Sequence, residues 1–210
     1  MPHNITLYHY WRSSCSWRVR WALQLKGIEH NLIAVDLLKN EQQQSTYLQQ
    51  NPSGFVPSLI VDGKAYGESM AIIEWINEKW PHNPLLPEDP FARLLTRQLY
   101  MTIASGTQPL QNLIAQQFHS DDKDKRVEYA RYWINRGLKA YETILNQHGL
   151  GGHFSLGETI TMADLCLIPQ CYNARRYTID LEQFPKIKKI EQRSLATEAC
   201  QRAAPDSFQP

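Results

Sequence analysis

The sequence predicts an α+β protein in which a small four-stranded mixed sheet with helices on its faces is followed by an all-helical part. Up to residue 80, short apolar runs alternate with stretches of helical periodicity. Residues 81–90 ("PHNPLLPEDP") contain four prolines, which is typical of a linker. From residue 91 onward only helical patterns remain. We therefore predict a first domain at residues 1–82, a linker at 83–90 and an all-helical domain at 91–210.

Composition and charge indicate a globular protein and exclude several classes of partner. The chain has 210 residues, of which 42% are hydrophobic and 20% are charged. A net charge of +1 gives no electrostatic reason to expect binding to nucleic acid or to an anionic membrane. The sequence shows no apolar run of the roughly 20 residues that span a bilayer and no signal-peptide pattern. We expect a cytoplasmic protein with neither nucleic-acid nor membrane partners.

The first half of the predicted sheet domain follows a strand, helix, strand order. Residues 4–9 ("NITLYH") are typical of a strand. From Cys15 onward, apolar residues recur at helical spacing, and Gly27 provides a stop signal for that helix. Residues 32–36 ("LIAVD") predict a second strand, and residues 41–50 predict a polar helix or loop.

The second half of this domain is predicted as a hairpin followed by a helix. Pro57 opens an apolar strand that ends at Asp62-Gly63, a dipeptide favoured in two-residue hairpin turns, and "KAY" forms the returning strand. Helical periodicity then continues to Trp80, and Pro81 stops it. The complete order therefore predicts a four-stranded mixed sheet.

The remaining sequence predicts helices and no metal site. "TMAD" at Thr161–Asp164 resembles a capping box that starts a buried helix. The four cysteines form no C-x-x-C pair, so the common zinc and dithiol spacings are absent. Cys166 and Cys171 lie in an apolar helical stretch and are predicted to be buried. The predicted helices cover residues 91–118, 124–148, 161–176, 185–193 and 195–203.

The segment "WRSSCSWR" (11–18) is the first candidate for function. A strand that runs through a polar turn into a helix presents free N–H groups, which together with the helix dipole stabilise an anion. Ser13, Ser14 and Cys15 lie in this turn, where each can donate a hydrogen bond to such an anion. The alternative is that Ser13 or Ser14 only caps the helix. This stretch alone does not separate the two interpretations.

Two further features strengthen the functional interpretation. "FVPSL" places Pro57 just before an apolar strand, where a cis bond would leave the backbone of Val56 free to pair with an extended peptide. "GES" opens the next helix, where Glu68 and Ser69 are suited to bind the amine and the carboxylate of a ligand. The alternative for both residues is again helix capping.

With these motifs in place, the chain resembles the zeta class of cytosolic glutathione transferases over nearly its whole length. The first matching segment is the most specific of the set. The resemblance implies a thioredoxin-like, glutathione-binding fold for residues 1–82, a cis Val56-Pro57 bond, glutathione as cofactor and a homodimer. The matching segments are "YWRSSCSWRVRWALQLKG" (10–27), "NPSGFVPSLIVDG" (51–63), "ESMAIIEW" (68–75), "TQPLQNL" (107–113), "TMADLCLIPQ" (161–170) and "NARRYTIDLEQFP" (173–185).

The resemblance also implies roles for individual residues in glutathione binding. Ser13 matches the serine that holds the thiolate, and the backbone of Val56 matches the partner of the cysteinyl part of glutathione. Many zeta-class relatives have Gln where this chain has Glu68, which suits the ligand's ammonium at least as well. The implied glutathione contacts are Ser13, Ser14, Gln44, Val56, Pro57, Glu68, Ser69, Gln108 and Asn112; the implied catalytic residues are Ser13, Ser14 and Cys15.

The activity implied by the resemblance is the cis–trans isomerisation of maleylacetoacetate to fumarylacetoacetate, a step of tyrosine and phenylalanine catabolism. Addition of the glutathione thiolate to the activated double bond, rotation and expulsion of glutathione account for this reaction without consuming glutathione. Arg12 and Arg176 match arginines that pair with the substrate's carboxylates, whereas Arg175 is better explained as a cation at a helix C-terminus.

Several alternatives remain open at the level of sequence. Maleylpyruvate, a smaller relative of the same substrate, fits the same residues. A general conjugating or peroxide-reducing glutathione transferase is a second alternative, and a non-catalytic interaction module is a third. Cys15 is suited to stabilise the enolate, to form a mixed disulfide with glutathione or merely to pack.

Overall fold

The structure is a computed structural model that describes residues 3–209. The chain forms two compact units. The first runs as far as Asn83 and resumes at Glu198, and the second is Pro84–Thr197. In the described part of the chain, no helix is both long and apolar enough to span a bilayer.

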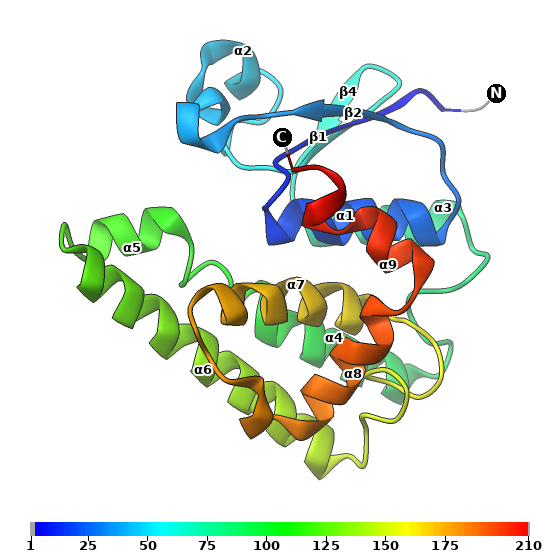
Figure 1. The fold of residues 1–210 in the computed structure, drawn as a ribbon. Coiled ribbons are helices and arrows are strands. Elements are labelled where there is room, and N and C mark those ends of the chain that lie inside the picture. Colours follow the sequence, from blue (N-terminus) through cyan, green and yellow to red (C-terminus); the bar gives the residue numbers. More distant parts are fainter. Residues whose placement is uncertain (1–2, 210) are drawn as a thin grey trace. The chain divides into compact units, whose positions relative to one another are not determined.

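The first unit contains the predicted four-stranded mixed sheet (Figure 1). The strand order is β2-β1-β3-β4; β1 pairs in parallel with β2 and antiparallel with β3, and β3 pairs antiparallel with β4. This arrangement confirms the predicted sheet. The elements are β1 (Ile5–His9), α1 (Ser14–Leu25), β2 (Asn31–Ala34), α2 (Ser45–Leu48), β3 (Ser58–Val61), β4 (Lys64–Tyr66) and α3 (Ser69–Lys79).

The register of the two central strands places the end of β1 beside the start of β3. Tyr8 on β1 lies opposite Ser58 on β3, so the end of β1 meets the start of β3. The second strand lies slightly earlier than the predicted 32–36, because the Asp36 carboxylate accepts the N–H of Leu38 and caps a short 3-10 turn instead. The polar stretch at 41–50 forms another 3-10 turn and then α2.

The second unit is helical, as predicted, but one predicted helix is wrong. The periodicity suggested a continuous helix over 91–118, whereas the structure has two helices separated by residues 105–112. Pro109 has no N–H to donate and Gly106 is a poor helix former, so the helix stops after Ala104. The helices are α4 (Pro90–Ala104), α5 (Leu113–His119), α6 (Lys123–Gln147), α7 (Met162–Arg176) and α8 (Pro185–Leu195).

Helix α7 forms the centre of the second unit and begins with the predicted capping box. One oxygen of the buried Asp164 carboxylate accepts the N–H of Thr161 at 2.8 Å, and the other accepts the N–H of Ser155 at 2.8 Å. Cys166 and Cys171 are fully buried on the same helix, as predicted. The box therefore ties the loop before α7 to the first turn of that helix.

The C-terminal segment requires a correction to the predicted boundary of the second domain. Helix α9 (Glu198–Ala203) packs along α1 in the first unit instead of joining the helical unit predicted at 91–210 (Figure 1). The buried Arg20 on α1 donates from Nε to the carbonyl of Ala203 at 2.9 Å. The prediction assigned this segment to the helical domain because the contact between Arg20 and Ala203 joins distant residues, and no local sequence pattern encodes it.

Candidate functional site

The turn between β1 and α1 combines a helix cap with free donors. Ser13 is the N-cap of α1, and its hydroxyl oxygen accepts the N–H of Ser16 at 3.1 Å. The hydroxyl hydrogen of Ser13 remains available for donation. Within residues 3–209, the N–H groups of Ser14 and Cys15 have no hydrogen-bond partner. The capping and anion-binding interpretations of this turn are therefore compatible.

The loop before β3 presents a free stretch of backbone at Val56. The Val56-Pro57 bond is cis. The preceding carbonyl, of Phe55, accepts from the hydroxyl of Tyr47 at 2.6 Å and from Nδ2 of Asn51 at 2.8 Å. Burial raises the pKa of Tyr47 to about 12, so its hydroxyl stays a donor. In the described residues neither the N–H nor the carbonyl of Val56 is paired, which leaves both for an extended ligand.

The start of α3 places one exposed carboxylate and one buried hydroxyl side by side. Glu68 has φ 60° and ψ 103°, a backbone conformation that costs a non-glycine residue about 1–3 kcal/mol and is concentrated at functional sites. Ser69 is buried, and its hydroxyl accepts from Nη1 of Arg18 on α1 at 3.3 Å. This bond fixes the start of α3 against α1.

The turn after β1 and the loop before β3 lie at the same end of the first unit. Tyr10, at the end of β1, and Val56 belong to one buried cluster, with Trp11 packed against it. Gln44 is the N-cap of α2, where its exposed side chain makes no capping bond. The neighbouring Gln43 donates to the carbonyl of Gly54 at 3.4 Å, which ties the α2 segment to the loop before β3.

In the second unit, Gln108 and Asn112 lie in the break between α4 and α5. The side-chain oxygen of Asn112 accepts the N–H of Leu113 at 2.7 Å and caps α5. Between these two residues, Gln111 exchanges amide hydrogen bonds of 3.3 and 3.1 Å with Gln170 on α7, and both side chains are buried. These bonds therefore hold the segment between α4 and α5 against α7, at the centre of the second unit.

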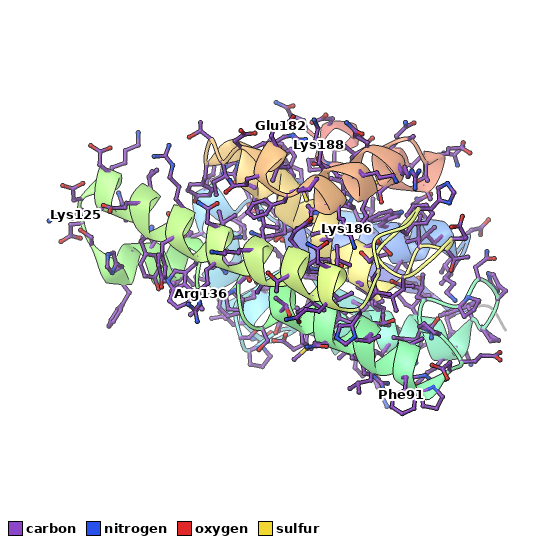
Figure 2. All side chains as sticks on the ribbon, turned by 90° about the horizontal axis from the view of Figure 1, so that it is seen from below. Phe91, Lys125, Arg136, Glu182, Lys186 and Lys188 are labelled. Carbon is purple, nitrogen blue, oxygen red and sulfur yellow. The ribbon has the colours of Figure 1, made fainter. Side chains whose placement is uncertain are left out.

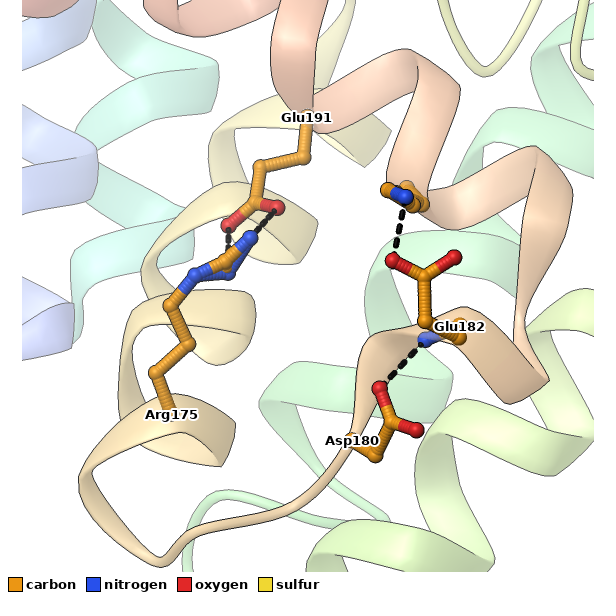
Figure 3. Close-up of polar contacts among 5 residues, drawn as sticks. Arg175, Asp180, Glu182 and Glu191 are labelled. Carbon is orange, nitrogen blue, oxygen red and sulfur yellow. Dashed lines mark hydrogen bonds and ion pairs between the residues drawn. The ribbon is translucent and has the colours of Figure 1, made fainter.

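The two neighbouring arginines at the end of α7 have different surroundings. Arg175 donates to both carboxylate oxygens of the buried Glu191 at 3.2 and 2.5 Å, as Figure 3 shows. Arg176 is exposed; its Nη1 donates to the side-chain oxygen of Asn173 at 3.3 Å, and its guanidinium lies 6.0 Å from the ring centre of Tyr177. Arg175 is thus paired with a buried carboxylate, while Arg176 is an exposed residue that contacts Asn173 and Tyr177.

Arg12 and Cys15 flank the two serines of the turn before α1. The guanidinium of Arg12, just before the serines, lies 5.3 Å from the ring centre of Trp11. Cys15 is a partly buried free thiol. Among residues 3–209, no group of three or more His, Cys, Asp or Glu side chains is placed to hold a metal ion.

Reasoning from sequence missed the residues that support this end of the sheet. Arg18 and Arg20 are both about 1% exposed, although each carries a charge, and Asn51 is also buried. The signal was present in "WRVRW", where two arginines alternate with apolar residues on a helix that has few exposed positions. Two charged side chains on a buried helix require specific partners.

Family comparisons cover both units of the chain. The family model "Glutathione S-transferase, N-terminal domain" matches residues 12–79. The model "Glutathione S-transferase, C-terminal domain" matches residues 108–199. Together they cover more than half of the sequence.

Individual relatives match over nearly the full length. A "Probable maleylacetoacetate isomerase 2" of Drosophila melanogaster is 44% identical over 206 residues, which are 97% of this chain and 88% of the relative. A crystal structure of maleylacetoacetate isomerase from Anaeromyxobacter dehalogenans 2CP-1, with bound GSH in the active site, is 42% identical with a TM-score of 0.88 and covers 97% of this chain and 96% of its own. The holo structure of a maleyl pyruvate isomerase, a bacterial zeta-class enzyme, has a TM-score of 0.93 at 35% identity, with 98% of both chains covered.

Proposed function

Because the chain belongs to the glutathione S-transferase family, and to its zeta class, we propose that it is a glutathione-dependent cis–trans isomerase that converts maleylacetoacetate to fumarylacetoacetate. The observation that carries this proposal is the agreement over nearly the whole chain with relatives of about 40% identity that bear the name maleylacetoacetate isomerase. The intact turn at Ser13, with its free donors, supports it.

The residues present fit glutathione. The hydroxyl of Ser13 and the N–H groups of Ser14 and Cys15 are suited to hold a thiolate at the start of α1. The unpaired backbone of Val56 suits the cysteinyl part, and the exposed carboxylate of Glu68 suits the ammonium of the γ-glutamyl end. The further proposed contacts are Gln44, Pro57, Ser69, Gln108 and Asn112.

Bound glutathione supplies a thiol nucleophile, and the protein's part is to keep that thiol ionised and to orient the substrate. A hydroxyl and two backbone N–H groups aimed at one anion favour the charged form, so they raise the fraction of thiolate at neutral pH. We propose that the guanidinium groups of Arg12 and Arg176 pair with the carboxylates of the substrate, for which planar paired donors are well suited.

Maleylpyruvate isomerisation is the second candidate. A maleyl pyruvate isomerase structure and a maleylacetoacetate isomerase structure both reach a TM-score of 0.93 at 35% identity, so the fold supports the two substrates equally. Both candidates use the same proposed thiolate site and the same arginines. They differ only in the group that the substrate carries beyond its ketone.

We further infer a homodimer and a cytoplasmic location. Three apolar side chains on α4, at spacings of three and seven residues, are exposed: Phe91 at 77%, Leu94 at 61% and Met101 at 46%. Phe91 points away from the helix at the edge of the view in Figure 2. A second copy of the chain would cover this stripe, and sedimentation would then give twice the 24.4 kDa mass of one chain. Four free cysteines suit the reducing cytoplasm.

The decisive experiment supplies maleylacetoacetate or maleylpyruvate with and without glutathione, and follows isomerised product together with free thiol. We expect turnover only with glutathione and a constant thiol concentration. Ser13→Ala should lower kcat about 100-fold, the usual effect of removing one hydrogen-bond donor to a developing anion. Ser13→Thr, which keeps a hydroxyl and a cap, is the matched control and should retain most of the activity.

The outcomes separate the candidates. Loss of thiol in step with product would show a conjugating transferase instead of an isomerase. Full activity of Ser13→Ala would remove Ser13 from the mechanism. The substrate with the larger kcat/KM identifies which of the two isomerase activities the enzyme has evolved to perform.

A further inference from the structure

Arg20, in the middle of α1, is a buried cation at the centre of the first unit. It is about 1% exposed. Its Nε donates to the carbonyl of Ala203 at 2.9 Å, and its Nη2 donates to the carbonyl of Trp11 at 3.0 Å. Its Nη1 donates to the carbonyl of Tyr10 at 3.3 Å and to Nδ1 of His9 at 3.1 Å. Within residues 3–209 no carboxylate pairs with this guanidinium, which is held by neutral dipoles.

These acceptors lead directly into the turn that carries Ser13. The carbonyl of Tyr10 that accepts from Arg20 also accepts the N–H of Ser13 at 3.1 Å. The N–H of Tyr10 in turn points to the hydroxyl of Ser16 at 3.3 Å, and Ser16 donates its own N–H to the Ser13 hydroxyl. Arg20 and Ser13 are therefore separated by a single shared carbonyl group.

The C-terminal segment, defined as residues 198–209, covers Arg20. Helix α9 lies along α1 (Figure 1). Beyond α9, the ring of Phe208 lies 4.6 Å from the Arg20 guanidinium carbon, and its centre is 5.4 Å from that of the His9 ring, edge to face. Water is thus kept from the guanidinium by parts of the chain almost 190 residues away in sequence.

The ionisable groups around Arg20 do not neutralise it. Burial, followed by the charge of Arg20 and that of His30, lowers the pKa of His9 to about 4, so His9 is neutral at pH 7 and accepts through Nδ1. On α9, Glu198 and Arg202 are exposed and pair with each other at 2.5 Å. The Arg20 charge therefore persists inside the unit without a counter-ion among residues 3–209.

We propose that Arg20 is a positioning residue for the thiolate-binding turn, and that the C-terminal segment keeps its guanidinium out of water so that its charge favours the bound thiolate. This inference rests on the proposed binding of glutathione at Ser13. A charge acts over a longer distance when water is excluded, because the local dielectric constant is lower. Hydrogen bonds to two successive carbonyls also fix the turn within the narrow limits that a catalytic donor requires.

The test is a pH titration of glutathione bound to the intact protein, followed by the ultraviolet absorbance of the thiolate. Arg20→Met should raise the thiol pKa by about 1, which lowers the ratio of thiolate to thiol at a given pH about tenfold. Arg20→Lys should give a smaller rise, because an ammonium keeps the charge but cannot reach all four acceptors. Arg202→Met is the matched control: it also removes one positive charge, from an exposed position, and should leave the thiol pKa unchanged.

Phe208→Ala keeps the result interpretable if Arg20→Met does not fold. This variant leaves every hydrogen bond of Arg20 in place and only admits water to the guanidinium, so we expect a rise in the thiol pKa smaller than in Arg20→Met. An unchanged thiol pKa in both Phe208→Ala and whichever Arg20 variants fold would overturn the inference. A wild-type protein that binds no glutathione would instead overturn the proposed function.

Discussion

At the level of the residue, two adjacent arginines of the same charge are expected to have different roles. Arg175 and Arg176 both end α7, and charge alone does not distinguish them. Arg175 is paired with Glu191, a carboxylate only 3% exposed, whereas Arg176 is an exposed residue that donates to the side chain of Asn173. Removing the first should therefore affect folding, and removing the second should affect the reaction.

The variant Arg175→Met should lower the free energy of unfolding by about 2 kcal/mol at pH 7, because it leaves a buried carboxylate without its partner. Burial already raises the pKa of Glu191, and Arg175 opposes that effect. Without Arg175, the folded state holds the Glu191 proton to a higher pH than the unfolded state does. The loss of stability should therefore be smaller near pH 4.5 than at pH 7, as urea unfolding at both values would show.

The variant Arg176→Met is the matched comparison. We expect a change in stability within about 0.5 kcal/mol, as for most exposed substitutions. The value of kcat/KM for the dicarboxylate substrate should fall at least tenfold, while the affinity for glutathione should stay the same. A loss of stability in Arg176→Met equal to that in Arg175→Met would contradict this division of roles.

At the level of the element, α6 and α8 cap one another. The N-cap of α8, Phe184, has no side-chain capping bond. The carboxylate of Glu142 on α6 takes that place and accepts the N–H groups of Lys186 and Ile187, both at 3.0 Å. In return, the ammonium of Lys186 donates to the carbonyl of Leu145 in the last turn of α6 at 3.1 Å, and to that of Leu150 just after the helix at 2.6 Å. Lys186 is labelled in Figure 2.

The variant Glu142→Ala should therefore cost about 1–3 kcal/mol of stability, because it leaves one buried and one partly buried donor at the start of α8 unpaired. Glu182→Ala is the control, since Glu182 forms only a surface ion pair with Lys188 (Figure 3). Its loss should cost at most about 0.5 kcal/mol. Urea unfolding of the two variants gives the comparison, and equal losses would contradict the capping role of Glu142.

Elements that depend on contacts between neighbouring residues could be predicted from the sequence, whereas those that depend on distant residues could not. Local signals predicted the turn at Asp62-Gly63 and the capping box at Thr161, because the residues that make them are neighbours in the chain. The break between α4 and α5 was missed, because the apolar periodicity of the two helices concealed the effect of Pro109. The cap that Glu142 provides for α8 joins residues 44 positions apart, and no local pattern contains it.

For the candidate site, contiguous motifs led to Ser13, Val56 and Glu68, each of which begins or precedes a helix or strand. The residues that support them, such as Arg20 and Asn51, were not identified, because their importance depends on partners brought together by the fold. Sequence thus identified the residues expected to touch a ligand, while the structure was needed to identify those that hold them in place.

At the level of the whole molecule, the C-terminal segment packs against the first strand and the first helix of the first unit. His9, at the end of the first strand, lies between Arg20 and the C-terminal Phe208, and it is only 4% exposed. Protonating His9 would place a second positive charge against the Arg20 guanidinium. The docking of the C-terminal segment therefore depends on His9 being neutral.

The acid stability of the protein should report this arrangement. His9 titrates near pH 4 in the folded state but near 6.5 when unfolded, so as the pH falls between these values the unfolded state binds the additional proton. This single group should lower the free energy of unfolding by up to about 1.4 kcal/mol for each pH unit in that range. Above pH 6.5 and below pH 4 it should contribute no further change.

Other groups also change the stability with pH, so the prediction is made for a difference between two proteins. The raised pKa values of Asp164 and Glu191 favour the folded state as the pH falls, which opposes the effect of His9. His9→Asn removes the titration but retains an acceptor for Arg20, and the other groups remain the same. The stability of the wild type minus that of His9→Asn should be largest at pH 7 and should shrink toward pH 4. Chemical unfolding at pH 7, 5.5 and 4.5 measures it, and a constant difference would show that His9 is protonated equally in both states.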